Sequence, residues 1–118
     1  MTIKKCMKCG ATVSVIDDCD IKCCDEIMKE LKPNTVDASR EKHIPEYEVD
    51  DSILHVRVNH EMIEEHFIER IFLESDESII EIKFKPGDVP VVDLPYIKNS
   101  TLYSLCNKHN LWSIEVKW

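Results

Sequence analysis

The sequence lacks the features that mark membrane, nucleic-acid-binding and secreted proteins. None of its apolar runs approaches the roughly 18 residues that a membrane helix requires. It has no basic stripe: the formal charge is −8, and all of it arises in residues 37–118, since acids and bases balance over residues 1–36. We therefore expect neither a nucleic-acid partner nor membrane association. The lysine-rich residues 1–10 have no apolar segment behind them, so we expect no signal peptide and a cytoplasmic location.

Glycine is also scarce, with two residues in the whole chain, so most turns must be built from Asp, Asn, Ser and Pro. Residues 50–52 and 85–88 have turn composition. Stretches of alternating apolar and polar residues predict strands, and residues 60–70 fit a helix as well as a strand. The predicted strands cover residues 47–49, 54–58, 67–73, 79–84 and the alternation Ile114, Val116, Trp118. Short strands between turns favour a β-sandwich.

Cysteine and histidine occupy different parts of the chain. Five of the six cysteines lie before residue 25, whereas all five histidines lie after residue 42. This separation predicts a small cysteine-rich unit at residues 1–36 and a second unit at residues 37–118. A unit as small as the first buries too few apolar side chains to be stable alone, and a metal bound by four thiolates would stabilise it.

The cysteine-rich unit contains a Cys-x-x-Cys-Gly segment and an adjacent cysteine pair. Two thiolates three residues apart can bind one ion, and Gly10 lets the backbone turn behind them. The predicted ligands are Cys6, Cys9, Cys23 and Cys24. Four thiolates suit iron or zinc, so a structural zinc site remains an alternative. Cys19 is expected to be a free thiol.

The second unit offers imidazole and thiolate donors together. The candidates are His43, His60, His66, Cys106 and His109. Cys106 and His109, three residues apart in a polar segment, form a compact metal-binding pair. His60 and His66 would lie roughly 240° apart around a helix, so they can converge only across a turn. His55 alternates with apolar residues and is expected to be an ordinary surface histidine.

Three motifs then resemble one family. They are NTVDASREKHIPEYEV at 34–49, HEMIEEHFIERI at 60–71 and CNKHNLW at 106–112. In this order they resemble desulfoferrodoxin, a family of two-iron superoxide reductases, and residues 1–36 resemble its small desulforedoxin unit. The resemblance implies a mainly β chain, in which a rubredoxin-like metal domain precedes an immunoglobulin-like β-sandwich.

The resemblance also implies an activity, the one-electron reduction of superoxide to hydrogen peroxide without oxygen evolution. It implies two irons per chain, one held by the four cysteines and a catalytic one held by four equatorial imidazoles with Cys106 as axial thiolate. Lys42 would attract superoxide, and Glu41 would take the sixth position on oxidised iron. An external donor such as rubredoxin and a homodimer are also implied. The alternative function is a small non-haem iron electron-transfer or redox-sensing protein without turnover.

The chain departs from the family pattern at three places. Glu61 stands where proline is usual, and we expect it to loosen the loop that carries His60. Asn110 replaces a usual glycine, and asparagine tolerates the left-handed conformation that such a turn needs. Asp25 replaces another glycine, and the spacing from Cys9 to Cys23 is slightly short, so the first metal site is expected to differ in shape.

Overall fold

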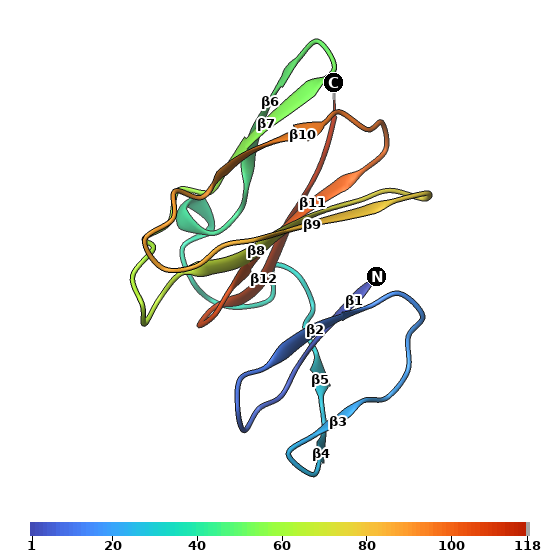
Figure 1. Cartoon of the computed structure of the whole chain (residues 1–118), viewed down its shortest axis with the longest axis vertical. Helices are drawn as coiled ribbons and strands as arrows, with labels where there is room; N and C mark the ends of the chain where they lie inside the picture. Colours follow the sequence, from blue (N-terminus) through green and yellow to red (C-terminus); the bar gives the residue numbers. More distant parts are fainter. Residues whose placement is uncertain (118) are drawn as a thin grey trace. The chain divides into compact units, whose positions relative to one another are not determined.

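The computed structural model describes residues 1–117 and consists of strands, turns and one short 3₁₀ helix (Figure 1). Contacts divide the chain into two compact units, Met1–Lys32 and Pro33–Trp118. Within residues 1–117, no helix has the length and apolar character needed to cross a membrane.

The first unit is a small antiparallel sheet with an added hairpin. Its strands are β1 (Thr2–Lys5), β2 (Thr12–Val15), β3 (Lys22–Cys23), β4 (Glu26–Ile27) and β5 (Lys29–Glu30). β1 lies between β2 and β5, and β3 pairs with β4. Ile3, Met28 and Leu31 are buried with Cys6 in a core of very few side chains. Such a core agrees with the expectation that a metal stabilises this unit.

The second unit contains a three-stranded and a four-stranded antiparallel sheet. Their strands are β6 (Glu46–Asp50), β7 (Ile53–Arg57), β8 (Ile68–Glu74), β9 (Ile79–Lys83), β10 (Val91–Pro95), β11 (Thr101–Cys106) and β12 (Asn110–Glu115). The order is β10-β7-β6 in one sheet and β12-β11-β8-β9 in the other. A 3₁₀ helix, η1 (Arg40–Lys42), precedes the first of these strands.

A single hydrophobic core joins the two sheets. Leu54 and Val56 of β7 pack with Ile71 and Leu73 of β8, and Leu102 of β11 belongs to the same buried cluster. Alternate residues of each strand therefore face inward, as in a β-sandwich. The predicted fold class, a small metal unit followed by a larger β unit, is confirmed.

The strands of the first unit were not predicted, and in the second unit the strand predictions were correct except at three places. The helical reading of residues 60–70 is wrong, because residues 60–67 lie in the loop between β7 and β8 and residues 68–70 begin β8. β10 and β11 were not predicted. The C-terminal strand β12 begins earlier than the predicted alternation, which reaches Trp118, a residue outside the described part.

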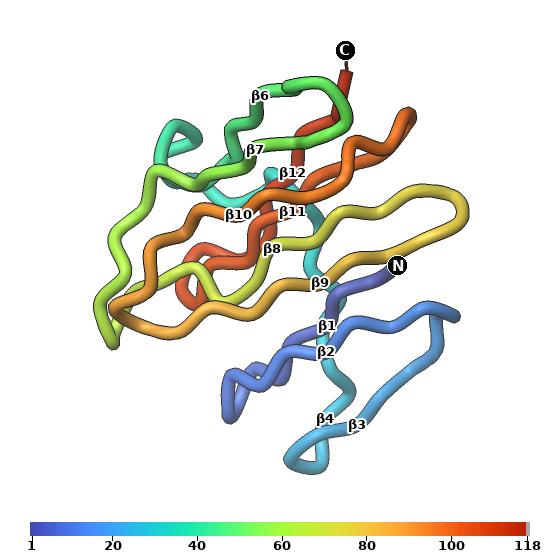
Figure 2. Tube along the Cα trace, turned by 45° about the horizontal axis from the view of Figure 1, so that its top comes forward, coloured from blue at the N-terminus to red at the C-terminus, as the bar shows by residue number. Residues whose placement is uncertain are grey.

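Three segments of the second unit converge at one end of the sandwich. The first is the stretch that follows η1, and the second is the loop between β7 and β8. That loop runs beside the segment before β10 (Figure 2), where Val58 N donates to Pro90 O at 3.0 Å and Gly87 N donates to Met62 O at 2.8 Å. The third is the turn between β11 and β12. These connections carry the histidines and the cysteine described next.

Candidate metal centres

The four predicted cysteine ligands of the first unit form one cluster. The Sγ atoms of Cys6, Cys9, Cys23 and Cys24 all lie within 4.8 Å of one another. Cys9 Sγ is 3.7 Å from Cys23 Sγ, which is 3.9 Å from Cys24 Sγ. A tetrahedron with metal–sulfur bonds of about 2.3 Å has corners roughly 3.8 Å apart. The cluster therefore fits a tetrahedral ion.

Two tight turns shape this cluster. Gly10, at φ +80, closes the first knuckle by donating from its N to Cys6 O at 2.9 Å. Between β3 and β4, Cys24 and Asp25 both have positive φ, 52° and 61°. Two successive left-handed residues make the type I′ hairpin turn that matches strand twist. Asp25 thus adopts the backbone conformation for which glycine would be usual.

The thiols influence one another's ionisation. The backbone amide of Cys9 lowers the pKa of Cys6 to about 7, whereas neighbouring thiols, Cys9 first, raise the pKa of Cys23 to about 12. Four thiolates so close together need a cation to offset their charge. Cys19 is exposed and lies outside the cluster.

The five candidate ligands of the second unit also come together. His43 Nε2 lies 3.0 Å from His109 Nδ1, which lies 3.2 Å from His66 Nε2. His66 Nε2 lies 3.1 Å from His60 Nε2. Cys106 Sγ is 3.5 Å from His60 Nε2 and 3.9 Å from His109 Nδ1. Turn residues 64 and 65 and the bridge between Ile63 and His66 allow His60 and His66 to converge.

These distances match the needs of one metal ion. Two donors at right angles around an ion, each about 2.1 Å from it, lie roughly 3.0 Å apart, close to the three nitrogen spacings of 3.0, 3.1 and 3.2 Å. The sulfur adds a fifth donor beside this set of nitrogens. An imidazole and thiolate donor set of this kind suits iron, copper or zinc.

The outward nitrogens of three histidines face oxygen acceptors. His43 Nδ1 lies 2.5 Å from Ser39 O, His60 Nδ1 lies 2.5 Å from Glu61 O, and His66 Nδ1 lies 2.6 Å from Glu61 Oε1. Each Nδ1 therefore carries the proton, and each Nε2 lone pair points toward the shared centre. Burial lowers the pKa of His60 and of His109, which favours the neutral form that binds metals.

Cys106 is the final residue of β11 and is 1% exposed, so the predicted polar loop begins only after it. His109 N donates to its sulfur at 3.3 Å. Asn107 connects the turn to the His66 segment, since its Oδ1 accepts from Phe67 N at 3.0 Å and its Nδ2 donates to Glu65 O at 3.0 Å. The sulfur thus accepts a backbone hydrogen bond, and Asn107 ties the turn that follows it to the His66 segment.

Sequence reasoning missed several supporting residues. The ring of Trp112 stacks on His43 at 4.9 Å, and its Nε1 donates to His109 O at 2.9 Å. Ser104 Oγ donates to His43 O. Glu61 was expected to loosen its loop, but it contacts two histidines instead. The sequence feature that could have indicated these contacts is the position of Glu61 directly after His60.

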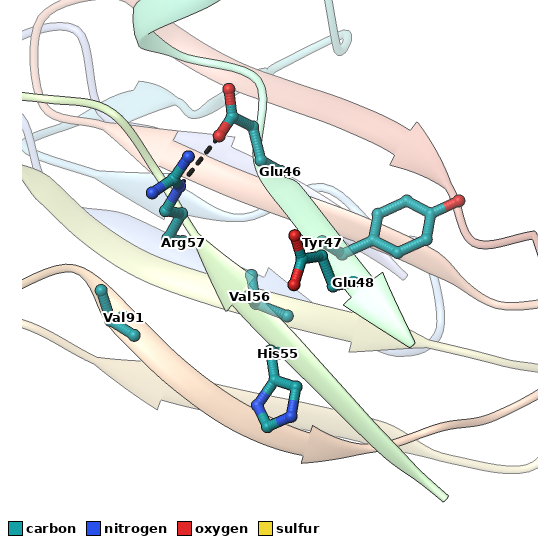
Figure 3. Close-up of a pocket in the computed structure, with 7 residues that line it drawn as sticks. All are labelled: Glu46, Tyr47, Glu48, His55, Val56, Arg57 and Val91. Carbon is teal, nitrogen blue, oxygen red and sulfur yellow. Dashed lines mark hydrogen bonds and ion pairs between the residues drawn. The ribbon is translucent and has the colours of Figure 1, made fainter. Parts of the chain in front are cut away.

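The remaining predicted residues lie around the histidine–cysteine cluster or away from it. Glu41 and Lys42 are exposed on η1, immediately before buried His43. Asn110 has φ 61°, so the expected tolerance of asparagine for this turn is confirmed. His55 lies on the three-stranded sheet beside a pocket lined by Glu46, Tyr47, Glu48, His55, Val56, Arg57 and Val91 (Figure 3). A hydrogen bond to Asp93 raises the pKa of His55.

Comparisons with known proteins agree with this arrangement. Residues 35–115 match the family model described as Desulfoferrodoxin. The chain is 37% identical over 120 residues to the desulfoferrodoxin of Nitratidesulfovibrio vulgaris, covering 96% of this chain and 94% of the relative. It is 33% identical over 118 residues to a desulfoferrodoxin homolog of Archaeoglobus fulgidus, covering 95% and 94%. The superoxide reductase structure from Treponema pallidum aligns with TM-score 0.73 at 25% identity, covering 95% and 98%.

Proposed function

Since the chain belongs to the desulfoferrodoxin family and is a superoxide reductase, we propose that it reduces superoxide to hydrogen peroxide with iron bound by its histidine–cysteine cluster. The residues that would hold the iron are His43, His60, His66, His109 and Cys106. Iron held there would supply one electron to superoxide, and the Cys106 thiolate would donate electron density that favours this transfer.

One observation carries this proposal. Four ring nitrogens and one sulfur, brought from three separate segments, point at a common centre with spacings that suit a single ion. Cys106 is buried, whereas His60, His66 and His109 are each partly exposed. The imidazole side can therefore be reached by a small anion while the sulfur stays away from water.

Two charged residues assist the proposed reaction. Lys42 is an exposed cation next to a ligand, and it can attract superoxide toward a site on an otherwise acidic protein. Glu41 precedes it on the same short helix, and we propose that its carboxylate would serve as a further ligand to the oxidised iron. Superoxide needs two protons to leave as hydrogen peroxide, and solvent reaches the imidazole side to supply them.

We further propose that the four cysteines of the domain at residues 1–36 hold a second iron, which passes electrons to the catalytic domain at residues 37–118. Cys9 and Cys24 are exposed, so a donor such as rubredoxin can approach the sulfur atoms closely. We also propose that the protein is a homodimer, as the family resemblance implies.

Metal analysis with visible spectroscopy tests this function. Protein from iron-replete cells should contain two irons per chain, absorb visible light when oxidised, and consume superoxide stoichiometrically when reduced, without evolving oxygen. Colourless protein with zinc in both sites would contradict the proposal. Two irons with superoxide loss at the uncatalysed rate would instead indicate electron transfer or redox sensing without turnover.

Replacing Lys42 with alanine should slow superoxide capture. Steering by a nearby cation raises association rates by 10-fold or more and weakens with salt, so Lys42→Ala should lower the bimolecular rate roughly tenfold and flatten its salt dependence. Pulse-generated superoxide, followed at the iron absorption band across ionic strengths, measures both effects.

Two variants serve as controls for the Lys42 experiment. Lys98→Ala removes an exposed lysine in the turn before β11, at the end of that strand far from Cys106, and should leave the rate unchanged. Glu41→Ala should not slow capture but should alter the spectrum of the oxidised iron at the histidine–cysteine cluster. Equal rates and salt slopes for Lys42→Ala and the wild-type protein would refute steering by Lys42.

A further inference from the structure

Glu61 contacts two of the proposed iron ligands at once. Its backbone carbonyl accepts from His60 Nδ1 at 2.5 Å, and its Oε1 accepts from His66 Nδ1 at 2.6 Å. The resemblance places proline at this position in the family, and proline has a carbonyl but no carboxylate. The bond between Glu61 and His66 is therefore a feature of this chain's own residue.

The two acceptors of Glu61 differ in charge. His60 faces a neutral carbonyl, as His43 does at Ser39 O, whereas His66 faces a carboxylate. The Glu61 side chain is largely exposed to water, so its carboxylate is ionised at neutral pH. An anionic acceptor draws the Nδ1 proton more strongly and makes the opposite Nε2 a stronger donor to a metal.

Charge also favours one oxidation state of the metal. An anion next to a ligand stabilises ferric iron more than ferrous iron, because the ferric ion carries one more positive charge. The Glu61 side chain is 54% exposed, and Lys108 exerts an attractive charge on it, so solvent and that cation reduce the effect. The short hydrogen bond through His66 is not screened in this way.

We propose that Glu61 is a positioning residue that fixes His66, tightens metal binding and lowers the reduction potential of the catalytic iron. This inference rests on the proposed iron at the histidine–cysteine cluster. Its role is to act through the imidazole, without contact with superoxide. A carboxylate, a histidine and a metal arranged in this order form a unit whose outer member commonly changes metal affinity 10–100-fold.

Glu61→Gln tests the inference, because glutamine can still accept the proton of His66 but carries no charge. Glu64→Gln removes an equal charge from an exposed residue of the same loop and serves as the matched control. We expect Glu61→Gln to weaken ferrous iron binding about tenfold, measured by chelator competition under anaerobic conditions. Its reduction potential should rise by up to about 59 mV, which for one electron is a tenfold decrease in the ratio of ferric to ferrous iron at a fixed solution potential.

The outcomes separate this inference from the proposed function. Wild-type protein without iron at the histidine–cysteine cluster would contradict both. If the iron-loaded Glu61→Gln protein matched the wild type in affinity and potential, the inference alone would be wrong. Equal shifts in Glu61→Gln and Glu64→Gln would also overturn it, because they would indicate loss of general surface charge. Glu61→Asp keeps the charge, so the reduction potential of its iron should lie closer to the wild-type value than that of Glu61→Gln.

Discussion

Cys106→Ser is expected to reduce the rate of superoxide reduction by more than about 100-fold, since changes only in the outer shell of a metal already cost 10–100-fold. A thiolate is a soft, electron-rich ligand, whereas serine offers a hard hydroxyl that stays protonated near neutral pH. The sulfur-to-iron absorption band of the histidine–cysteine site should vanish. The fold should persist, because serine is similar in shape and occupies the end of a strand.

The matched control for this experiment is Cys19→Ser. Cys19 is an exposed thiol outside both ligand clusters, so its loss should change neither the spectrum nor the rate. Stopped-flow kinetics with the reduced proteins and visible spectra of the oxidised ones measure both quantities. If the sulfur-to-iron band of the histidine–cysteine site were unaltered in Cys106→Ser, Cys106 could not be a ligand of that iron.

Trp112→Ala should have the largest effect on stability. Trp112 is 1% exposed, and removing a fully buried aromatic side chain typically costs about 3–5 kcal/mol. The same change removes the ring stacked on His43 and the donor to His109 O, so iron affinity should also fall, by about 10–100-fold. Urea unfolding of the iron-loaded protein and chelator competition measure the two losses separately.

Leu102→Ala distinguishes the two roles of Trp112. Leu102 is fully buried in the common core. It is the second residue of β11 and lies toward the end of that strand opposite Cys106. The Leu102→Ala substitution should cost about 2–5 kcal/mol of stability with little change in iron affinity. Trp112→Phe keeps a ring but loses the indole donor, and leaving His109 O without it should cost about 1–3 kcal/mol. Equal iron affinities for Trp112→Ala and Leu102→Ala would contradict a specific role for the stacked ring.

The sequence predicted donor identity better than it predicted local structure. Cysteine spacing indicated the first ligand cluster, and the Cys106–His109 spacing indicated part of the second. The complete ligand set of the second cluster came from the resemblance to desulfoferrodoxin. Strand β11 was not predicted because both of its faces are buried. Leu102, Ser104 and Cys106 lie on one face, and Leu105 is buried on the other. A strand buried on both faces lacks the alternation of apolar and polar residues that identifies a half-exposed strand.

Contacts that depend on tertiary structure could not be predicted from spacing. Residues 60–70 have helical periodicity, but a helix would separate His60 from His66, and the β-sandwich favours a loop there. The stacking of Trp112 on His43 joins residues far apart in the chain, so no local pattern indicates it. The hydrogen bond from His66 to Glu61 is local, but it depends on the geometry of the turn between them. Spacing indicated only that convergence of His60 and His66 requires a turn.

The three segments that meet at the histidine–cysteine cluster give a bound ion the properties of a covalent cross-link. Joining His43 to Cys106 closes a loop of roughly sixty residues, which in the chain-entropy treatment of disulfides corresponds to about 4 kcal/mol. Cys106 and His109 are adjacent on one hairpin and can capture an ion before distant segments arrive. His43 would close the longest of these loops, so its bond to the ion would restrict the unfolded chain most. A bound ion would therefore stabilise this end of the sandwich against unfolding.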